Sequence, residues 1–105
     1  MRKEIIILPK VEKNLKIMGE QIKLARLRRN FSMQLIADRA QISRPTLQKV
    51  ERGAPDVAIG IYARVLMAIG GMDEDLTLVC KDDVAGRTFQ DLNIKVNKRS
   101  TKRKF

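Results

Sequence analysis

The chain of 105 residues is long enough for one small domain with short extensions, and its hydrophobic content of 44% permits a compact, mainly aliphatic core. One cysteine, Cys80, and no histidine exclude an intramolecular disulfide, a usual zinc site and a Cys–His or Ser–His nucleophile, so we expect no metal, no cofactor and no enzymatic activity. The net charge of +10 is segregated, with +8 in residues 1–53, −4 in residues 54–94 and +6 in residues 95–105. This segregation indicates a polyanionic partner that approaches from one side.

The two ends of the chain differ from its middle. The apolar run Ile5–Leu8 is too short for a signal peptide or a membrane span, and the single cysteine fits a reducing compartment, so a cytoplasmic location is expected. Residues 1–9 are predicted to form an N-terminal extension. Residues 95–105 are basic and polar, and we expect a flexible tail with sequence-independent affinity for a polyanion, which could be DNA, RNA or an acidic face of a partner protein.

A first helix is predicted from about Lys10 to Arg29, because Pro9 suits a first helical turn. Gly19 could instead divide this stretch into a lead-in and a shorter helix. At 100° per residue, the helix carries two apolar stripes on opposite faces. One should face the core; the other should pack on a terminal extension or contact another chain. The core stripe is Val11, Leu15, Met18, Ile22 and Ala25, and the second, a candidate partner-binding surface, is Ile17, Leu24 and Leu27.

Two short helices follow, and each is preceded by a serine that can cap it. Gly53 suits the position after the second of them. Pro45 falls in a first helical turn, where its missing N–H would have no partner inside the helix. The predicted helices are Met33 to Ala40 after Ser32 and Arg44 to Arg52 after Ser43. The predicted inward residues are Ile36, Ala37, Leu47 and Val50, and the outward ones on the earlier helix are Gln34, Asp38 and Arg39.

A fourth helix is predicted over residues 57–69, ended by Gly70-Gly71. It is apolar over most of its circumference, which favours a dimer contact. One more helical turn is predicted at residues 73–75. The following Leu76-Thr77-Leu78-Val79-Cys80 is typical of a strand, which needs a partner in residues 4–8 or in a second chain.

The two short helices have the pattern of a helix-turn-helix, in which the second helix enters the major groove of DNA. Residues 31–53, FSMQLIADRAQISRPTLQKVERG, resemble the Xre/Cro family of helix-turn-helix proteins, and the resemblance extends over about residues 15–75. The chain departs from the family at Met33, where glutamine usually contacts DNA, and at Gln41, where glycine is usual and a positive φ would be mildly strained. The matching positions are Gly19, Ile22, Arg26, Ser32, Ala37, Ile42, Ser43, Arg44, Thr46, Leu47, Glu51, Arg52 and Gly53.

Roles in DNA binding follow from the chemistry of the side chains in that frame. Arg44 and Lys49 can donate to guanine O6 and N7, and Gln48 can pair with adenine or reach a phosphate. Pro45 and Thr46 can contact a thymine methyl group, and the capping serines suit phosphates. The alternative is a solvated polar helix. The candidate DNA-binding residues are Ser32, Gln34, Ser43, Arg44, Pro45, Thr46, Gln48 and Lys49.

The family resemblance also implies an ion pair between Arg26 and Glu51 that links the first helix to the third. We therefore assign these two residues a structural role. The expected fold is all-α, a four- to five-helix Xre-type domain over residues 10–75, with a short β-strand that pairs across a dimer within residues 76–94.

The order of elements looks like that of the HipB-type antitoxins, which partner HipA-type Ser/Thr kinase toxins. That resemblance implies a homodimer that binds operator DNA and represses its own operon. Residues 82–92, DDVAGRTFQDL, resemble C-terminal extensions of some regulators encoded beside such kinases; alternatively they form an amphipathic segment folded on its own domain. Two other functions remain open, a module whose main task is to hold a kinase toxin and a stand-alone phage-type repressor. An enzyme has little support, because Asp82-Asp83 lies in no acid–base frame.

Overall fold

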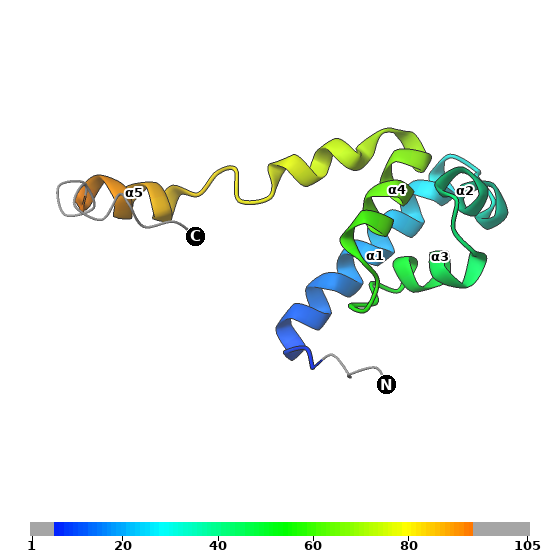
Figure 1. The fold of residues 1–105 in the computed structure, drawn as a ribbon, viewed down its shortest axis with the longest axis horizontal. Coiled ribbons are helices and arrows are strands. Elements are labelled where there is room, and N and C mark those ends of the chain that lie inside the picture. The colour runs from blue at the N-terminus through cyan, green and yellow to red at the C-terminus, as the bar shows by residue number, and fades with distance from the viewer. Residues whose placement is uncertain (1–5, 94–105) are drawn as a thin grey trace.

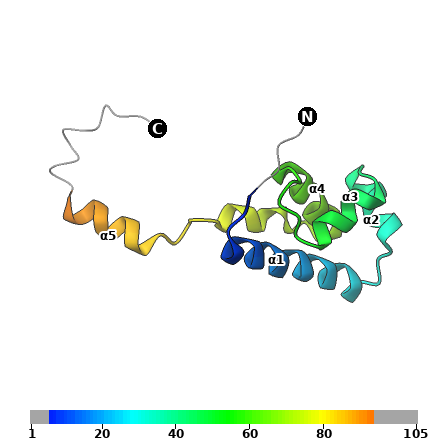
Figure 2. The same ribbon diagram turned by 90° about the horizontal axis from the view of Figure 1, so that it is seen from below.

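A computed structural model describes residues 6–93, which form helices and no strand. Helices α1 to α4 gather into one body, and α5 stands apart at the end of an extended connection (Figures 1 and 2). The all-α class is thus confirmed for this part of the chain. The predicted basic tail and most of the predicted N-terminal extension lie outside the described residues. The segments are α1 Pro9–Arg28, α2 Met33–Ala40, α3 Arg44–Glu51, α4 Ile59–Gly70, the 3-10 helix η1 Met72–Leu78, and α5 Val84–Leu92.

Helix α1 is continuous through Gly19, so the proposed division at this residue is wrong. The glycine is needed for packing, because a Cβ there would lie 2.8 Å from the carbonyl oxygen of Val50 and 2.9 Å from that of Glu51. Gly53 lies against the same stretch of α1 with a left-handed φ of 71°, and a Cβ on it would collide with the backbone of Leu15. The backbone of α1 therefore touches the end of α3 directly.

Serine caps begin α2 and α3 as the sequence predicts. The Ser32 hydroxyl oxygen accepts a hydrogen bond from the Leu35 N–H at 3.0 Å. The Ser43 hydroxyl oxygen accepts one from the Thr46 N–H at 3.2 Å. Gln41 ends α2 in the left-handed region, with φ 58°, and confirms that the turn needs a positive φ at the position where the related family favours glycine.

The core lies where α1, α2, α3 and α4 meet, and it is aliphatic apart from Tyr62. Of the predicted core stripe of α1, Ile22 and Ala25 are buried and Met18 is half-buried against them. Val11 is 44% exposed, so its assignment to the core is wrong for the single chain. The assignment fails because the first turns of α1 project beyond the other helices of the body (Figure 1). The buried apolar residues are Ile22, Ala25, Ile36, Ala37, Ala40, Leu47, Val50, Tyr62, Val65, Ala68 and Ile69.

Helix α4 crosses the body and is tied down at both ends. The Tyr62 hydroxyl donates to the carbonyl oxygen of Ala54 at 2.7 Å, which fixes the turn before the helix. Gly71 ends α4 with φ 75°. The apolar circumference is only partly covered, since Ile59 is 66% and Met67 58% exposed.

The predicted strand at residues 76–80 is wrong. Leu76, Thr77 and Leu78 belong to η1, and the chain turns at Val79 and Cys80. The Thr77 hydroxyl donates to the carbonyl oxygen of Glu74 at 2.7 Å, so the threonine supports a helical turn. The described residues contain no edge strand that could pair with the backbone N–H and C=O groups of an extended segment. Hydrogen bonds within the segment pair these groups instead.

Candidate nucleic-acid interface

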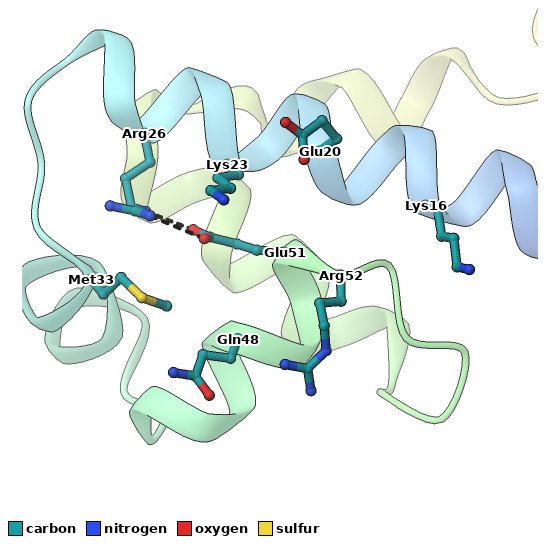
Figure 3. A pocket seen from close by; sticks show the side chains of 8 residues that line it. All are labelled: Lys16, Glu20, Lys23, Arg26, Met33, Gln48, Glu51 and Arg52. Atoms are coloured by element: carbon teal, nitrogen blue, oxygen red, sulfur yellow. Dashed lines mark hydrogen bonds and ion pairs between the residues drawn. The ribbon is translucent and has the colours of Figure 1, made fainter.

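Helix α3 presents one face to solvent and buries the other. Leu47 and Val50 are fully buried against the core, which anchors the helix along its length. At 100° per residue, Arg44, Gln48 and Arg52 follow one another on the outward face. Figure 3 shows Gln48 and Arg52 projecting from this side.

A buried ion pair fixes the C-terminal end of α3 to α1. The Arg26 Nε lies 2.6 Å from Glu51 Oε2, its Nη2 donates to Oε1 at 3.1 Å, and both side chains are less than a tenth exposed. The remaining nitrogen, Nη1, donates to the carbonyl oxygen of Phe31 at 2.9 Å. One guanidinium thus holds α1, α3 and the loop before α2 together, which confirms the structural role that the family resemblance implies (Figure 3).

The candidate residues of α3 do not all project alike. Arg44 and Pro45 are exposed at the helix start, as is Gln48 one turn later. Thr46 is half-buried, and its hydroxyl shares a hydrogen bond of 2.9 Å with that of Ser43. The two hydroxyl groups are therefore engaged in the local cap.

Lys49 is held by an ion pair in the free protein. Its Nζ lies 3.0 Å from Asp56 Oδ2, and the two side chains are 41% and 33% exposed. Asp56 follows the turn after α3, so the pair folds the lysine back along the helix end. A partly exposed pair of this kind contributes about 0–1 kcal/mol, which permits exchange of the carboxylate for another acceptor.

The two candidate residues at the start of α2 both make hydrogen bonds within α2. The Gln34 amide donates to Asp38 Oδ1 at 2.8 Å along the surface of α2. Met33, the residue that replaces the family's usual glutamine, instead lines a hollow together with Gln48 and Arg52. Ser32 is exposed beside it and engaged in its cap.

That hollow, here named the α1–α3 hollow, has a volume of about 580 Å³. Three cationic side chains surround it, Lys16 and Lys23 from α1 and Arg52 from the end of α3 (Figure 3). Glu20 also lines it, while Glu51 is neutralised by Arg26. The arrangement can hold an anionic group beside the outward face of α3.

Sequence reasoning missed these three cations. Lys16 and Lys23 lie seven residues apart on α1, a spacing that places them on one helical face. Arg52 lies four residues after Gln48. Both spacings were visible in the sequence, but the packing of α1 on α3 was needed to bring the two faces together.

The candidate partner-binding stripe lies exposed on α1. Ile17, Leu24 and Leu27 are 47%, 40% and 47% exposed, and none belongs to the core or its half-buried margin. Among residues 6–93, no group of three or more acidic, cysteine or histidine side chains is placed to hold a metal ion. The same part of the chain has no helix of the length and apolar character needed to cross a membrane.

Comparison with known proteins agrees with this geometry. Residues 22–66, from the core face of α1 into α4, match the helix-turn-helix family model. No curated protein and no solved structure matches the chain. Residues 22–66 therefore form a helix-turn-helix domain of the Xre/Cro type, a kind of domain that indicates DNA binding in transcriptional regulation.

Proposed function

We propose that this chain is a sequence-specific repressor that binds operator DNA as a homodimer and acts as the antitoxin, or an accessory antitoxin, of a toxin–antitoxin operon that it regulates itself. The outward face of α3 carries the proposal. There Arg44 and Gln48 stand clear of the core on a helix fixed by a buried ion pair. A helix of this kind is the element that enters the major groove in helix-turn-helix proteins.

The surroundings of that face support contact with the DNA backbone. Lys16, Lys23 and Arg52 lie beside it around the α1–α3 hollow and suit phosphate oxygens. Arg44 suits guanine, with Gln48 as a partner for adenine or a phosphate. Lys49 would have to leave Asp56 to reach the DNA, a low-cost exchange for a pair this exposed.

The test separates base recognition from phosphate contact. Binding is measured by fluorescence anisotropy, with DNA from upstream of the protein's own coding sequence and with scrambled DNA of the same length. Arg44→Ala should lower affinity for the operator by about 1–3 kcal/mol and leave affinity for scrambled DNA nearly unchanged. Lys23→Ala should weaken both alike and reduce the salt slope by about 1.

Lys81→Ala is the matched control, since it removes the same charge from the connection to α5, outside the helix-turn-helix. It should leave operator preference unchanged. Equal affinity of the wild-type protein for operator and scrambled DNA would overturn sequence-specific repression. An Arg44→Ala variant with full operator preference would overturn the assigned reading face.

The antitoxin part of the proposal adds a HipA-like kinase toxin as partner. The exposed stripe Ile17, Leu24 and Leu27 supports it, since these side chains have no cover among the described residues. The same stripe favours the second candidate function, a module whose main task is to hold the toxin. A stand-alone phage-type repressor is the third alternative, and it would have no kinase partner.

Leu24→Glu tests the stripe, and Asn14→Glu on α1 is a control that makes the same change of charge at an exposed polar position outside the stripe. A kinase encoded beside this gene should copurify with wild-type protein and with the control, and be lost with Leu24→Glu, while operator binding stays intact. Capture undiminished by Leu24→Glu would reject the stripe as the toxin site. Absence of capture by the wild-type protein would favour the stand-alone repressor.

A further inference from the structure

A second apolar depression lies on the other side of α1. It has a volume of about 350 Å³ and lies between α1, the end of α4 and η1; we name it the α1–η1 groove. Its floor is formed by core residues such as Ile22 and Ala25, so it opens directly onto the packed interior. The lining residues are Met18, Gln21, Ile22, Ala25, Arg28, Leu66, Met72, Asp75, Leu76 and Val79.

Helix α5 carries an apolar face with no cover. At 100° per residue, Val84, Thr88, Leu92, Ala85 and Phe89 fall within an arc of roughly 140°. No residue of α5 is buried, and Val84, Phe89 and Leu92 are 67%, 70% and 77% exposed. A helix of nine residues is marginal in isolation and gains stability from packing its apolar face.

The connection directs α5 away from its own groove. Val79 lines the groove, yet Cys80 turns the chain with a left-handed φ of 63°. The Lys81 N–H donates to the Leu78 carbonyl oxygen at 3.1 Å, and Arg87 Nη2 donates to the Lys81 carbonyl oxygen at 2.7 Å. Figures 1 and 2 show α5 projecting clear of the body as a result. Each copy thus has an open groove and an apolar helix held away from it.

The charges on the two surfaces are complementary. Segment 82–93 has a net charge of −2, and the charged residue of α1 that lines the groove is Arg28. Asp91 borders one edge of the apolar face of α5, with Arg87 beyond it and hydrogen-bonded to the Lys81 carbonyl oxygen, and the other edge is bordered by the uncharged Gly86. The groove has Arg28 on its α1 wall and Asp75 on its η1 wall. Helix α5 can therefore lie with Asp91 toward Arg28 of α1 and its uncharged edge toward Asp75 of η1.

We propose that α5 of one copy docks in the α1–η1 groove of a second copy, and that the exchange is reciprocal. Exchange of identical elements between protomers is a low-cost route to a dimer. This inference rests on the homodimer in the proposed function and specifies how it is built.

The exchange leaves the DNA-facing surface free. On α1, Met18, Gln21 and Ala25 line the groove, whereas Lys16 and Lys23 line the α1–α3 hollow. These two sets of residues project from opposite sides of the helix. Two copies joined through α5 can therefore each present α3 to a half-site.

The first experiment measures the dimer dissociation constant of the full chain by sedimentation. Phe89→Glu places a charge on the apolar face of α5 and should raise the constant by about tenfold or more. Gln90→Glu adds the same charge on the polar face and should leave it within about twofold. Because α5 contributes no buried residue to the body, α1 to α4 should stay folded in both variants, and Phe89→Glu should lose at most the helical circular dichroism signal of the nine residues of α5. A Phe89→Glu variant that dimerises like the wild-type protein would overturn the proposal.

A mixing experiment tests the exchange itself. The combined Arg28→Glu and Val79→Asp variant damages the groove at exposed positions, and alone it should be as monomeric as Phe89→Glu. A mixture of the two proteins should recover dimer, because one intact helix meets one intact groove. Dimers of the groove variant alone would indicate pairing of α5 with α5, and a mixture without dimer would indicate a different interface; either outcome overturns the exchange.

Failure of this proposal and failure of the proposed function give different results. If the monomeric Phe89→Glu variant still binds a single operator half-site more tightly than scrambled DNA, the variant has lost the dimer but kept DNA recognition. Reciprocal exchange in a protein without any operator preference would leave the dimer intact and reject the repressor.

Discussion

Breaking the ion pair between Arg26 and Glu51 should cost more stability than any change on the DNA-facing surface. In Glu51→Leu, the guanidinium of Arg26 stays buried at about 7% exposure without its carboxylate. A buried charge left without its partner costs about 3–5 kcal/mol. For a domain of this size, each kcal/mol lowers the midpoint of thermal unfolding by about 4–8 °C, so a drop of roughly 12 °C or more is expected.

The loss should be at least as large in Arg26→Met. This variant strands the Glu51 carboxylate and also removes the donor to the Phe31 carbonyl oxygen at 2.9 Å. The double variant should be more stable than either single one, because it leaves no buried charge. It should still fall about 1–3 kcal/mol below the wild-type protein, the cost of the unpaired carbonyl group.

Urea unfolding of the four proteins, followed by circular dichroism, gives the coupling energy of the pair. A coupling of at least about 3 kcal/mol is expected, because the two single losses together exceed the loss in the double variant by that much or more. Lys49 and Asp56 provide the control within the same chain, since a cycle of Lys49→Met and Asp56→Asn should give about 1 kcal/mol or less at this exposure. Similar couplings for the two pairs would refute the argument from burial.

Three further predictions concern the scaffold. Gly19→Ala should lower the unfolding free energy by about 1–3 kcal/mol, because the added Cβ clashes with Val50. Gly60→Ala has nothing within 4 Å of its added Cβ and should raise the unfolding free energy by up to about 1 kcal/mol. Equal effects of the two variants in urea unfolding would contradict the close approach of α1 and α3 at Gly19. Gln41→Gly should stabilise the protein by about 0.5–1 kcal/mol through relief of the left-handed φ of 58°, and a lower urea midpoint would argue against strain there. Burial, and secondly the charge of Asp56, raises the pKa of Tyr62 above its usual 10.0. The neutral phenol therefore stabilises the fold fully below pH 10, and this stability is lost as the pH rises through the pKa of the folded protein. Tyr62→Phe should reduce this loss of stability at alkaline pH, and an unchanged dependence of unfolding free energy on pH would exclude the tyrosine as its source.

The parts of the fold that local chemistry specifies could be predicted from sequence. Ser32 and Ser43 cap the helices that follow them, because a side-chain oxygen close in sequence satisfies a free backbone N–H. The positive φ at Gln41 was expected from comparison with a glycine position in a related family. The helix-turn-helix pattern is equally local, since spacing alone sets which residues of α3 face outward.

Other features were settled by contacts between distant segments. Residues 76–80 have strand-forming side chains, yet they lie in η1 and a turn, because a strand needs an edge to pair with and the described chain offers none. Gly19 was ambiguous until α3 was seen packed against it. Helix α5 appeared in the sequence only as a possible amphipathic segment.

The DNA-facing surface shows the same division. The sequence by itself determined that Arg44 and Gln48 project from α3, because helical periodicity and a buried Leu47 leave them no other side. Only the tertiary structure decided that Lys16 and Lys23 of α1 join them, and that Lys49 is turned toward Asp56. Periodicity orders the side chains around one helix; only the packing of one helix on another determines which faces become a single surface.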